Sequence, residues 1–269
     1  MTPRRFGGKL QKVRAAVRPG YFNLVDLRFF VPSWDLEQTP FLGAVSRAME
    51  SVLGKKTFAR WIGDVDAQPL AANDSGLLGL EELPAAVCQM IEDAQAAMPE
   101  RPWHELERAD GWLPVEYEPD EAADYADQCD LVAGISVVPW MWQNALSAIP
   151  FDSARHSRCG ERFCYLKMDC TSGWHYAKFA DREEIEQALD ASLRSGRLGS
   201  VVGGGAGLRY SYIELALANV AQAWREIREI LLEGRLPKRT WLLFHDAALS
   251  ARRLGLYDDT PAPPSSGEG

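Results

Sequence analysis

The clearest pattern of hydrophobic and polar positions lies in the second half of the chain, between residues 163 and 246. Apolar residues recur at spacings of three and four over 181–193 and 220–231, which predicts two helices. Short runs of β-branched and aromatic residues predict four strands, over residues 163–170, 198–202, 208–217 and 241–244. The resulting order, strand–helix–strand–strand–helix–strand, is that of a ferredoxin-like βαββαβ plait.

The first half of the chain alternates strand-like and helix-like segments less regularly. Strands are predicted over 21–31 and 57–62, and helices over 39–54 and 80–98. Residues 99–150 contain six prolines and predict strands over 113–117 and 131–138, a short acidic helix between them, and a helix over 140–149. We therefore expect an α+β protein in which the plait packs on an N-terminal α/β half. A short sequence similarity between residues 55–58 and 238–241 leaves open whether the two halves arose by duplication.

Composition divides the chain into four expected parts. Residues 1–20 carry six arginines and lysines and no acidic residue, which predicts a basic flexible arm. Residues 21–150 form the expected N-terminal α+β half, and residues 151–259 the expected plait. The tail over 260–269 is rich in proline, serine and glycine and is predicted to be disordered.

The cysteine count and the lengths of the apolar runs bear on the cellular location. Five cysteines form an odd set without disulfide-like spacing, which favours reduced thiols and a cytoplasmic location. No apolar run approaches the roughly 18–20 residues that a membrane-spanning helix needs, so no membrane association is expected.

Strand alternation assigns half of the plait's side chains to the face opposite its two helices. Cys164, Leu166 and Met168 form the apolar set of the first strand and are predicted to face the helices. The opposite face is then expected to collect a candidate open-face site: Tyr165, Lys167, Asp169, Tyr210, Tyr212, Glu214, Trp241 and His245. A surface with this many aromatic residues needs either a cover or a ligand.

A second candidate surface is acidic. Ten carboxylate residues lie between residues 105 and 130 and are opposed by a single basic residue, Arg108, in a chain of net charge −9. Such carboxylate displays speed association with cationic partners and disfavour nucleic-acid binding. The candidate partner-binding surface consists of Glu116, Glu118, Asp120, Glu121, Asp124 and Asp127.

Two further sequence patterns resemble ligand-binding motifs, but a structural role explains them better. Residues 203–207 are rich in glycine but lie between two predicted strands rather than before a helix, so a hairpin turn is expected instead of a phosphate cradle. The remaining pattern is a set of zinc-ligand residue types whose spacing matches no common zinc knuckle, namely His156, Cys159, Cys164 and Cys170. No metal and no cofactor are therefore predicted.

Three functions remain open at this point. The leading hypothesis is a non-enzymatic protein-interaction module, an acidic inhibitor or immunity-type protein that binds a basic partner. The alternative is an enzyme or small-ligand-binding protein that uses the open face, and the groups to test there are His245, Glu214, Tyr212, Asp169 and Lys167. Asp246, which follows His245, and the more distant Glu214 and Asp169 are the carboxylates that an imidazole–carboxylate pair would use. The third is an RNA-binding plait, because aromatic residues on its two central strands can stack bases. A homo-oligomer formed through the open face is a further expectation.

Overall fold

A computed structural model describes residues 12–32, 38–71, 76–107, 111–138, 140–145, 149–173 and 178–265. The fold is mixed α+β, as the sequence predicts. The chain divides into two compact units, Met1–Met98 and Pro99–Gly269. This boundary differs from the expected one at residue 150, because strands from residues 113–136 join the sheet of the second unit.

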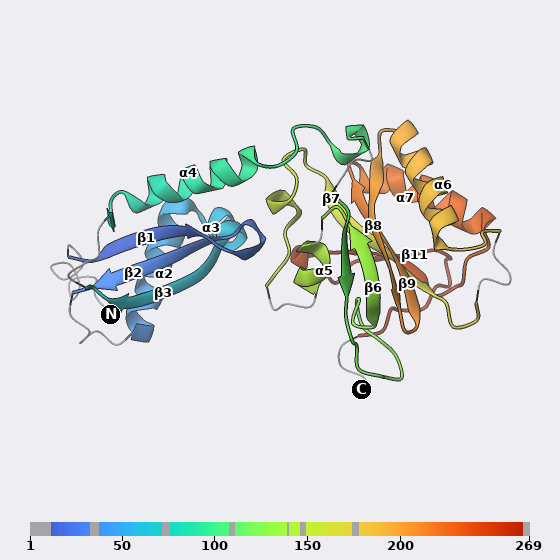
Figure 1. Ribbon diagram of the computed structural model, residues 1–269, viewed down its shortest axis with the longest axis horizontal. Coiled ribbons are helices and arrows are strands. Elements are labelled where there is room, and N and C mark those ends of the chain that lie inside the picture. Colours follow the sequence, from blue (N-terminus) through green and yellow to red (C-terminus); the bar gives the residue numbers. More distant parts are fainter. Residues whose placement is uncertain are drawn as a thin grey trace. The chain divides into compact units, whose positions relative to one another are not determined.

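The N-terminal unit is a four-stranded sheet with the strand order β3-β2-β1-β4 (Figure 1). Strands β1 and β2 are antiparallel, and β3 pairs with β2 in parallel. Its elements are β1 (Arg14–Pro19), a 3-10 turn (Tyr21–Asn23), β2 (Val25–Val31), α2 (Gln38–Leu53), α3 (Lys55–Trp61), β3 (Ile62–Pro69), β4 (Leu78–Gly79) and α4 (Leu83–Ala96).

Two expectations for this unit are wrong. Arg14–Pro19 is not a flexible arm: it forms β1, which is paired on both sides. Its small or apolar residues alternate with basic ones, so Val13 and Ala15 enter the core while the charges face away. Residues 57–61 are helical rather than extended, because Gly54 at a φ of 83° turns the chain from α2 into α3. The first eleven residues lie outside the described part.

The C-terminal unit is a seven-stranded sheet with the order β11-β10-β7-β9-β8-β6-β5, and each neighbouring pair is antiparallel. Its strands are β5 (Leu113–Glu116), β6 (Leu131–Ser136), β7 (Arg162–Asp169), β8 (Gly199–Gly207), β9 (Tyr210–Leu217), β10 (Thr240–Phe244) and β11 (Arg253–Gly255). Its helices are α5 (Trp140–Ala145), α6 (Arg182–Ser195) and α7 (Val220–Glu233), with 3-10 turns at Trp103–Glu105, Ser153–Arg155 and Ala247–Leu249.

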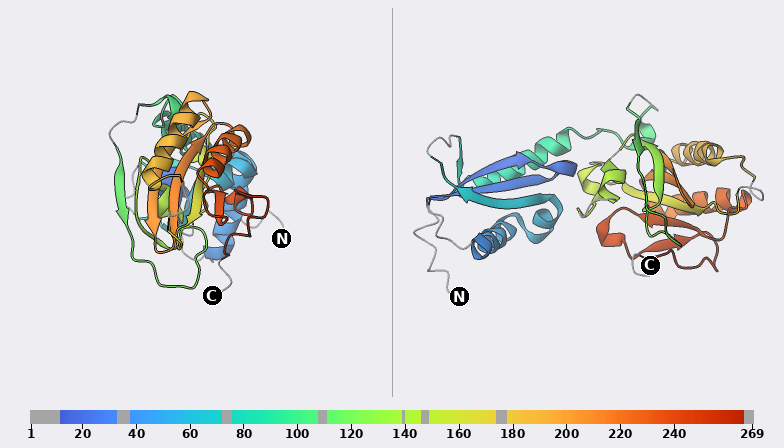
Figure 2. Two further views of the ribbon diagram at one scale, coloured as in Figure 1. Left: turned by 90° about the vertical axis from the view of Figure 1, so that its right-hand side faces the viewer. Right: turned by 60° about the horizontal axis from the view of Figure 1, so that its bottom comes forward.

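Helices α6 and α7 cover one face of this sheet (Figure 2). Asp181 and Asn219 cap their N-termini by accepting hydrogen bonds from the backbone N–H groups of Glu184 and Gln222. Alternate residues of β7, such as Cys164 and Leu166, pack beneath the helices. The elements from β7 to β10 therefore follow the predicted order of strands and helices.

The glycine-rich run does not form a turn. It belongs to β8, and the connection to β9 consists of residues 208 and 209. A Cβ on Gly205 would lie 2.7 Å from Leu131 and 3.0 Å from the indole of Trp142, so the absence of side chains lets these groups pack directly on the sheet. The predicted acidic helix between β5 and β6 is also absent, because residues 117–130 run as turns and bends.

Within the described residues, no helix is both long enough and apolar enough to cross a membrane.

Candidate functional site

The candidate open-face residues lie on the sheet face opposite α6 and α7, and that face is covered. Seven of the eight are at most 6% exposed: Tyr165, Lys167, Asp169, Tyr210, Tyr212, Glu214 and Trp241. The eighth, His245, has a side chain that is 4% exposed. The face is therefore a second core rather than an accessible surface.

Two stretches of the same chain provide the cover. We call residues 117–131 the covering segment and residues 260–265 the tail segment. Tyr125 and Leu131 of the covering segment join the aromatic core, and Trp142 from α5 packs edge-on against Tyr212. The tail segment passes over Trp241, whose indole N–H donates to the carbonyl of Pro261 over 2.7 Å. The expected disorder at 260–269 is thus wrong for the part of the tail that is described.

Asp130 fixes the end of the covering segment to the sheet. Its carboxylate is fully buried and accepts the backbone N–H groups of Arg209 and Tyr210, each over 2.8 Å. It also accepts the hydroxyl of Tyr212. Burial raises the pKa of Tyr212, and the adjacent Asp130 raises it further, so this hydroxyl stays a donor.

Lys167 fixes the middle of the covering segment. Its ammonium group donates to the backbone carbonyls of Tyr125 and Asp127 and lies 4.1 Å from the ring centroid of Tyr210. Burial lowers the pKa of Lys167 to about 8, while the nearby carboxylates, Asp130 first among them, oppose that shift. The lysine therefore serves as a structural tie between strand β7 and the covering segment.

A network of two arginines and two aspartates closes the rim of the covered face. Arg239 forms ion pairs with Asp124 over 2.6 Å and with Asp169 over 2.9 Å, and Arg209 pairs with Asp169 over 2.9 Å. Burial raises the pKa of Asp124, but hydrogen bonds from Tyr210 and Arg239 hold it below its ordinary value. The carboxylates are thus ionised and matched by the guanidinium groups.

Of the three carboxylates considered for His245, Glu214 pairs with it, and the pair lies inside the protein. Nε2 of His245 lies 2.6 Å from Oε2 of Glu214, and Gln128 donates to the other carboxylate oxygen over 2.6 Å. Glu214 is fully buried. His245 packs against the rings of Phe151 and Tyr165. A substrate could reach this pair only if the covering segment moved away.

The six carboxylates of the candidate acidic surface divide into two groups. Glu116, Glu118, Asp120 and Glu121 are exposed, and none forms an ion pair with another described residue. Asp124 points into the arginine network. Asp127 is exposed, and one carboxylate oxygen lies 3.5 Å from the hydroxyl of Tyr165.

The inward contacts of this segment were missed by sequence reasoning. Asp124 and Asp130 look no different from their solvent-facing neighbours in the sequence, and their partners Arg209 and Arg239 lie about 80 residues or more along the chain. No local motif marks such pairs. In the part of the chain that is described, no group of three or more histidine, cysteine, aspartate or glutamate residues could hold a metal ion.

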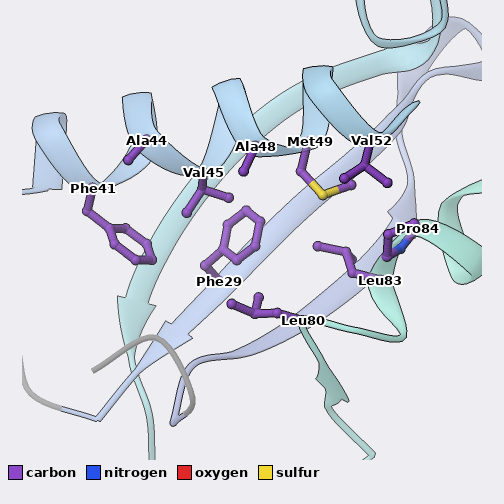
Figure 3. A pocket seen from close by; sticks show the side chains of 10 residues that line it. All are labelled: Phe29, Phe41, Ala44, Val45, Ala48, Met49, Val52, Leu80, Leu83 and Pro84. Carbon is purple, nitrogen blue, oxygen red and sulfur yellow. The ribbon is translucent and has the colours of Figure 1, made fainter. Parts of the chain in front are cut away.

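A separate cavity of about 170 Å³ lies in the N-terminal unit (Figure 3). Phe29 of β2 forms its floor, residues of α2 form one wall, and Leu83 and Pro84 at the start of α4 form the opposite wall. The lining is apolar throughout, and the lining residues are Phe29, Phe41, Ala44, Val45, Ala48, Met49, Val52, Leu80, Leu83 and Pro84. Two of the lining residues, Ala48 and Val52, are exposed, so the space is an apolar hollow that opens to solvent.

Filling this cavity is expected to stabilise the N-terminal unit. Ala44→Leu adds an isopropyl group at a position that lines the space, which should raise the free energy of unfolding by about 1 kcal/mol. Urea denaturation of the whole protein provides the measurement. Ala85→Leu, an exposed position on α4, is the matched control and should have no effect. A destabilised Ala44→Leu variant would show that the cavity cannot accept the added volume.

Comparison of the chain with protein-family models, curated proteins and solved structures finds no match in any of the three.

Proposed function

We propose that this protein is a non-enzymatic protein-interaction module, an acidic inhibitor or immunity-type protein that binds a basic partner. The observation that carries the proposal is the orientation of the covering segment. Its inward groups fasten it to the sheet through Asp130 and the carbonyls that hold Lys167. Its outward carboxylates are left free for a partner.

A fastened acidic segment is a better binding surface than a flexible one. Glu116 lies at the end of β5, and Glu118, Asp120 and Glu121 lie between two held positions, since the N–H of Tyr117 donates to the carbonyl of Val132 and that of Ala122 to the hydroxyl of Tyr125. Binding therefore has less of this backbone to order. Uncompensated negative charge of this density attracts a cationic surface over the Debye length, about 10 Å at 0.1 M salt. The association should therefore be fast and sensitive to salt.

The two other functions receive less support. An enzyme or ligand site on the open face would need Glu214 and His245 to be accessible, and both side chains are buried. An RNA-binding plait would need Tyr165 and Tyr210 free to stack bases, and both are covered. A homo-oligomer built on this face would first have to displace the covering segment.

We also propose that the C-terminal sheet is built on a ferredoxin-like plait. The strand order β10-β7-β9-β8 with α6 and α7 on one face supports a ferredoxin-like plait over residues 162–244. Here β5, β6 and β11 extend that sheet at both edges. The cytoplasmic location remains a prediction from the cysteine pattern.

Affinity capture tests the proposal. The intact protein is immobilised and exposed to a lysate of its source cells at 50 mM and at 500 mM salt. We expect a basic protein to be retained at low salt only, and to be lost from a variant carrying Glu116→Gln, Glu118→Gln, Asp120→Asn and Glu121→Gln. The matched control changes four exposed glutamates elsewhere to glutamine: Glu81, Glu92, Glu226 and Glu229. Equal capture by both variants would contradict the proposal.

A further inference from the structure

A groove of about 650 Å³ lies between the covering segment and the tail segment. One wall consists of residues of the covering segment, including Asp120, Asp124 and Tyr125. The other wall consists of the tail residues Ala262, Pro263, Pro264 and Ser265, and Arg239 also lines the groove. The groove is thus bounded partly by a proline-rich stretch of the chain itself.

The base of the tail is positioned by the fold. The backbone N–H of Tyr257 donates to the hydroxyl of Thr260 over 2.8 Å, and that of Thr260 donates back to the carbonyl of Tyr257. Thr260 approaches the sheet at Gly255, where a Cβ would lie 2.6 Å from it. This turn directs the following prolines across the sheet face and over Trp241.

The contact made there is the one by which aromatic grooves bind proline-rich peptides. Proline residues have no N–H to donate, so such peptides are held through their carbonyls and by packing on aromatic rings. The indole of Trp241 donates to the carbonyl of Pro261, and the guanidinium of Arg239 stacks 5.4 Å from the indole ring. A proline-rich segment of the same chain therefore already occupies this surface.

The charges of the groove are not matched by the tail. Arg239 is neutralised by Asp124 and Asp169, whereas Asp120 is exposed and forms no ion pair with any described residue. Residues 260–269 contain no lysine, arginine or histidine and include Glu268. A proline-rich strand carrying a cation would add an ion pair that the protein's own tail cannot make.

We propose that the surface occupied by the tail segment, at Trp241 and along the covering-segment wall of the groove, binds a proline-rich segment of a partner in place of the chain's own tail, and that this segment carries a lysine or arginine that pairs with Asp120. The inference rests on the proposed function, since the ligand is taken to be a segment of the basic partner. The chain's own tail competes with the partner segment, so the apparent affinity for the partner segment is proportional to the fraction of molecules in which the tail has left the surface. If the tail occupies the surface in about nine-tenths of the molecules, releasing it raises the apparent affinity about tenfold.

The test uses a fluorescein-labelled decapeptide with the sequence Pro-Pro-Lys-Pro-Pro-Lys-Pro-Pro-Ala-Ala, and a second peptide with glutamate in place of both lysines. Fluorescence anisotropy reports binding to the full chain. A variant carrying Pro261→Gly, Pro263→Gly and Pro264→Gly keeps the length and charge of the tail, and its more flexible backbone lowers the fraction of molecules in which the tail occupies the surface. We expect the lysine peptide to bind this variant about tenfold more tightly than the wild type, and the glutamate peptide to bind neither.

Asp120→Asn should weaken binding of the lysine peptide severalfold, whereas Glu92→Gln, an exposed change in the N-terminal unit, should not. Equal binding of the two peptides, or no binding to the tail variant, overturns the groove inference. If the acidic surface still captures a basic protein in that case, the proposed function stands and only the groove assignment fails. If the affinity capture retains no basic protein at low salt, the proposed function is overturned, whatever the peptides show.

Discussion

Asp130→Ala is expected to lower the free energy of unfolding of the C-terminal unit by about 3–5 kcal/mol. The wild-type carboxylate is fully buried and accepts two backbone N–H groups and the hydroxyl of Tyr212. Alanine removes the acceptor of both N–H groups and leaves the Tyr212 hydroxyl with only the carbonyl of Asp127 at 3.3 Å, and each buried donor left without a partner costs about 1–3 kcal/mol. Urea denaturation followed by tryptophan fluorescence measures the change.

Asp120→Ala is the matched control for this prediction. It makes the same substitution in the same segment, but its carboxylate is exposed, so the free energy of unfolding should change by no more than about 0.5 kcal/mol. Similar losses in the two variants would mean that Asp130 does not fasten the covering segment.

Acid should destabilise the protein through His156, by about 3 kcal/mol at pH 4. Burial lowers the pKa of His156 to about 3, against an ordinary value of 6.5. The imidazole stacks on Phe151 with ring centroids 4.6 Å apart, and its Nε2 is buried without a hydrogen-bond partner among the described residues. Between pH 6.5 and 3 the unfolded chain therefore binds a proton that the folded chain excludes, and stability falls as the pH falls.

His156→Phe isolates this contribution, because it keeps an aromatic ring against Phe151 and removes the titrating group. Unfolding free energies of variant and wild type should agree within about 1 kcal/mol at pH 7 and separate steadily below pH 6.5, with the variant the more stable. Parallel curves from pH 7 to pH 4 would show that His156 is protonated inside the folded protein.

The elements from β7 to β10 were predictable because their signals are local. Helices α6 and α7 have apolar positions at regular spacing and an Asp or Asn cap at the first turn. Strand β1 was missed because its charges dominate the composition of residues 1–20, although Val13 and Ala15 already alternate with them. The first part of strand β8 was predicted, and its glycine-rich second part was missed because glycine favours turns in isolation, while here Trp142 and Leu131 need the space beside Gly205.

The covered face was predictable only in part. Alternation along β7 and β9 places Tyr165 and Tyr212 on the side away from the helices, and this depends on the strand period alone. What covers them depends on contacts between residues far apart in the sequence, such as Lys167 with the carbonyl of Asp127. The covering segment has no periodic pattern, so its charges gave no indication of which ones turn inward.

The cover also decides how the chain can be divided. The covering segment precedes β7 in the sequence and the tail segment follows β11, so the two flank the plait from opposite ends. A fragment limited to residues 151–259 would keep both helices and the central strands but would lose the acceptors of Lys167 and the partner of Trp241. Its exposed aromatic face would favour self-association, so a fragment that keeps this face covered has to include residues 117–265.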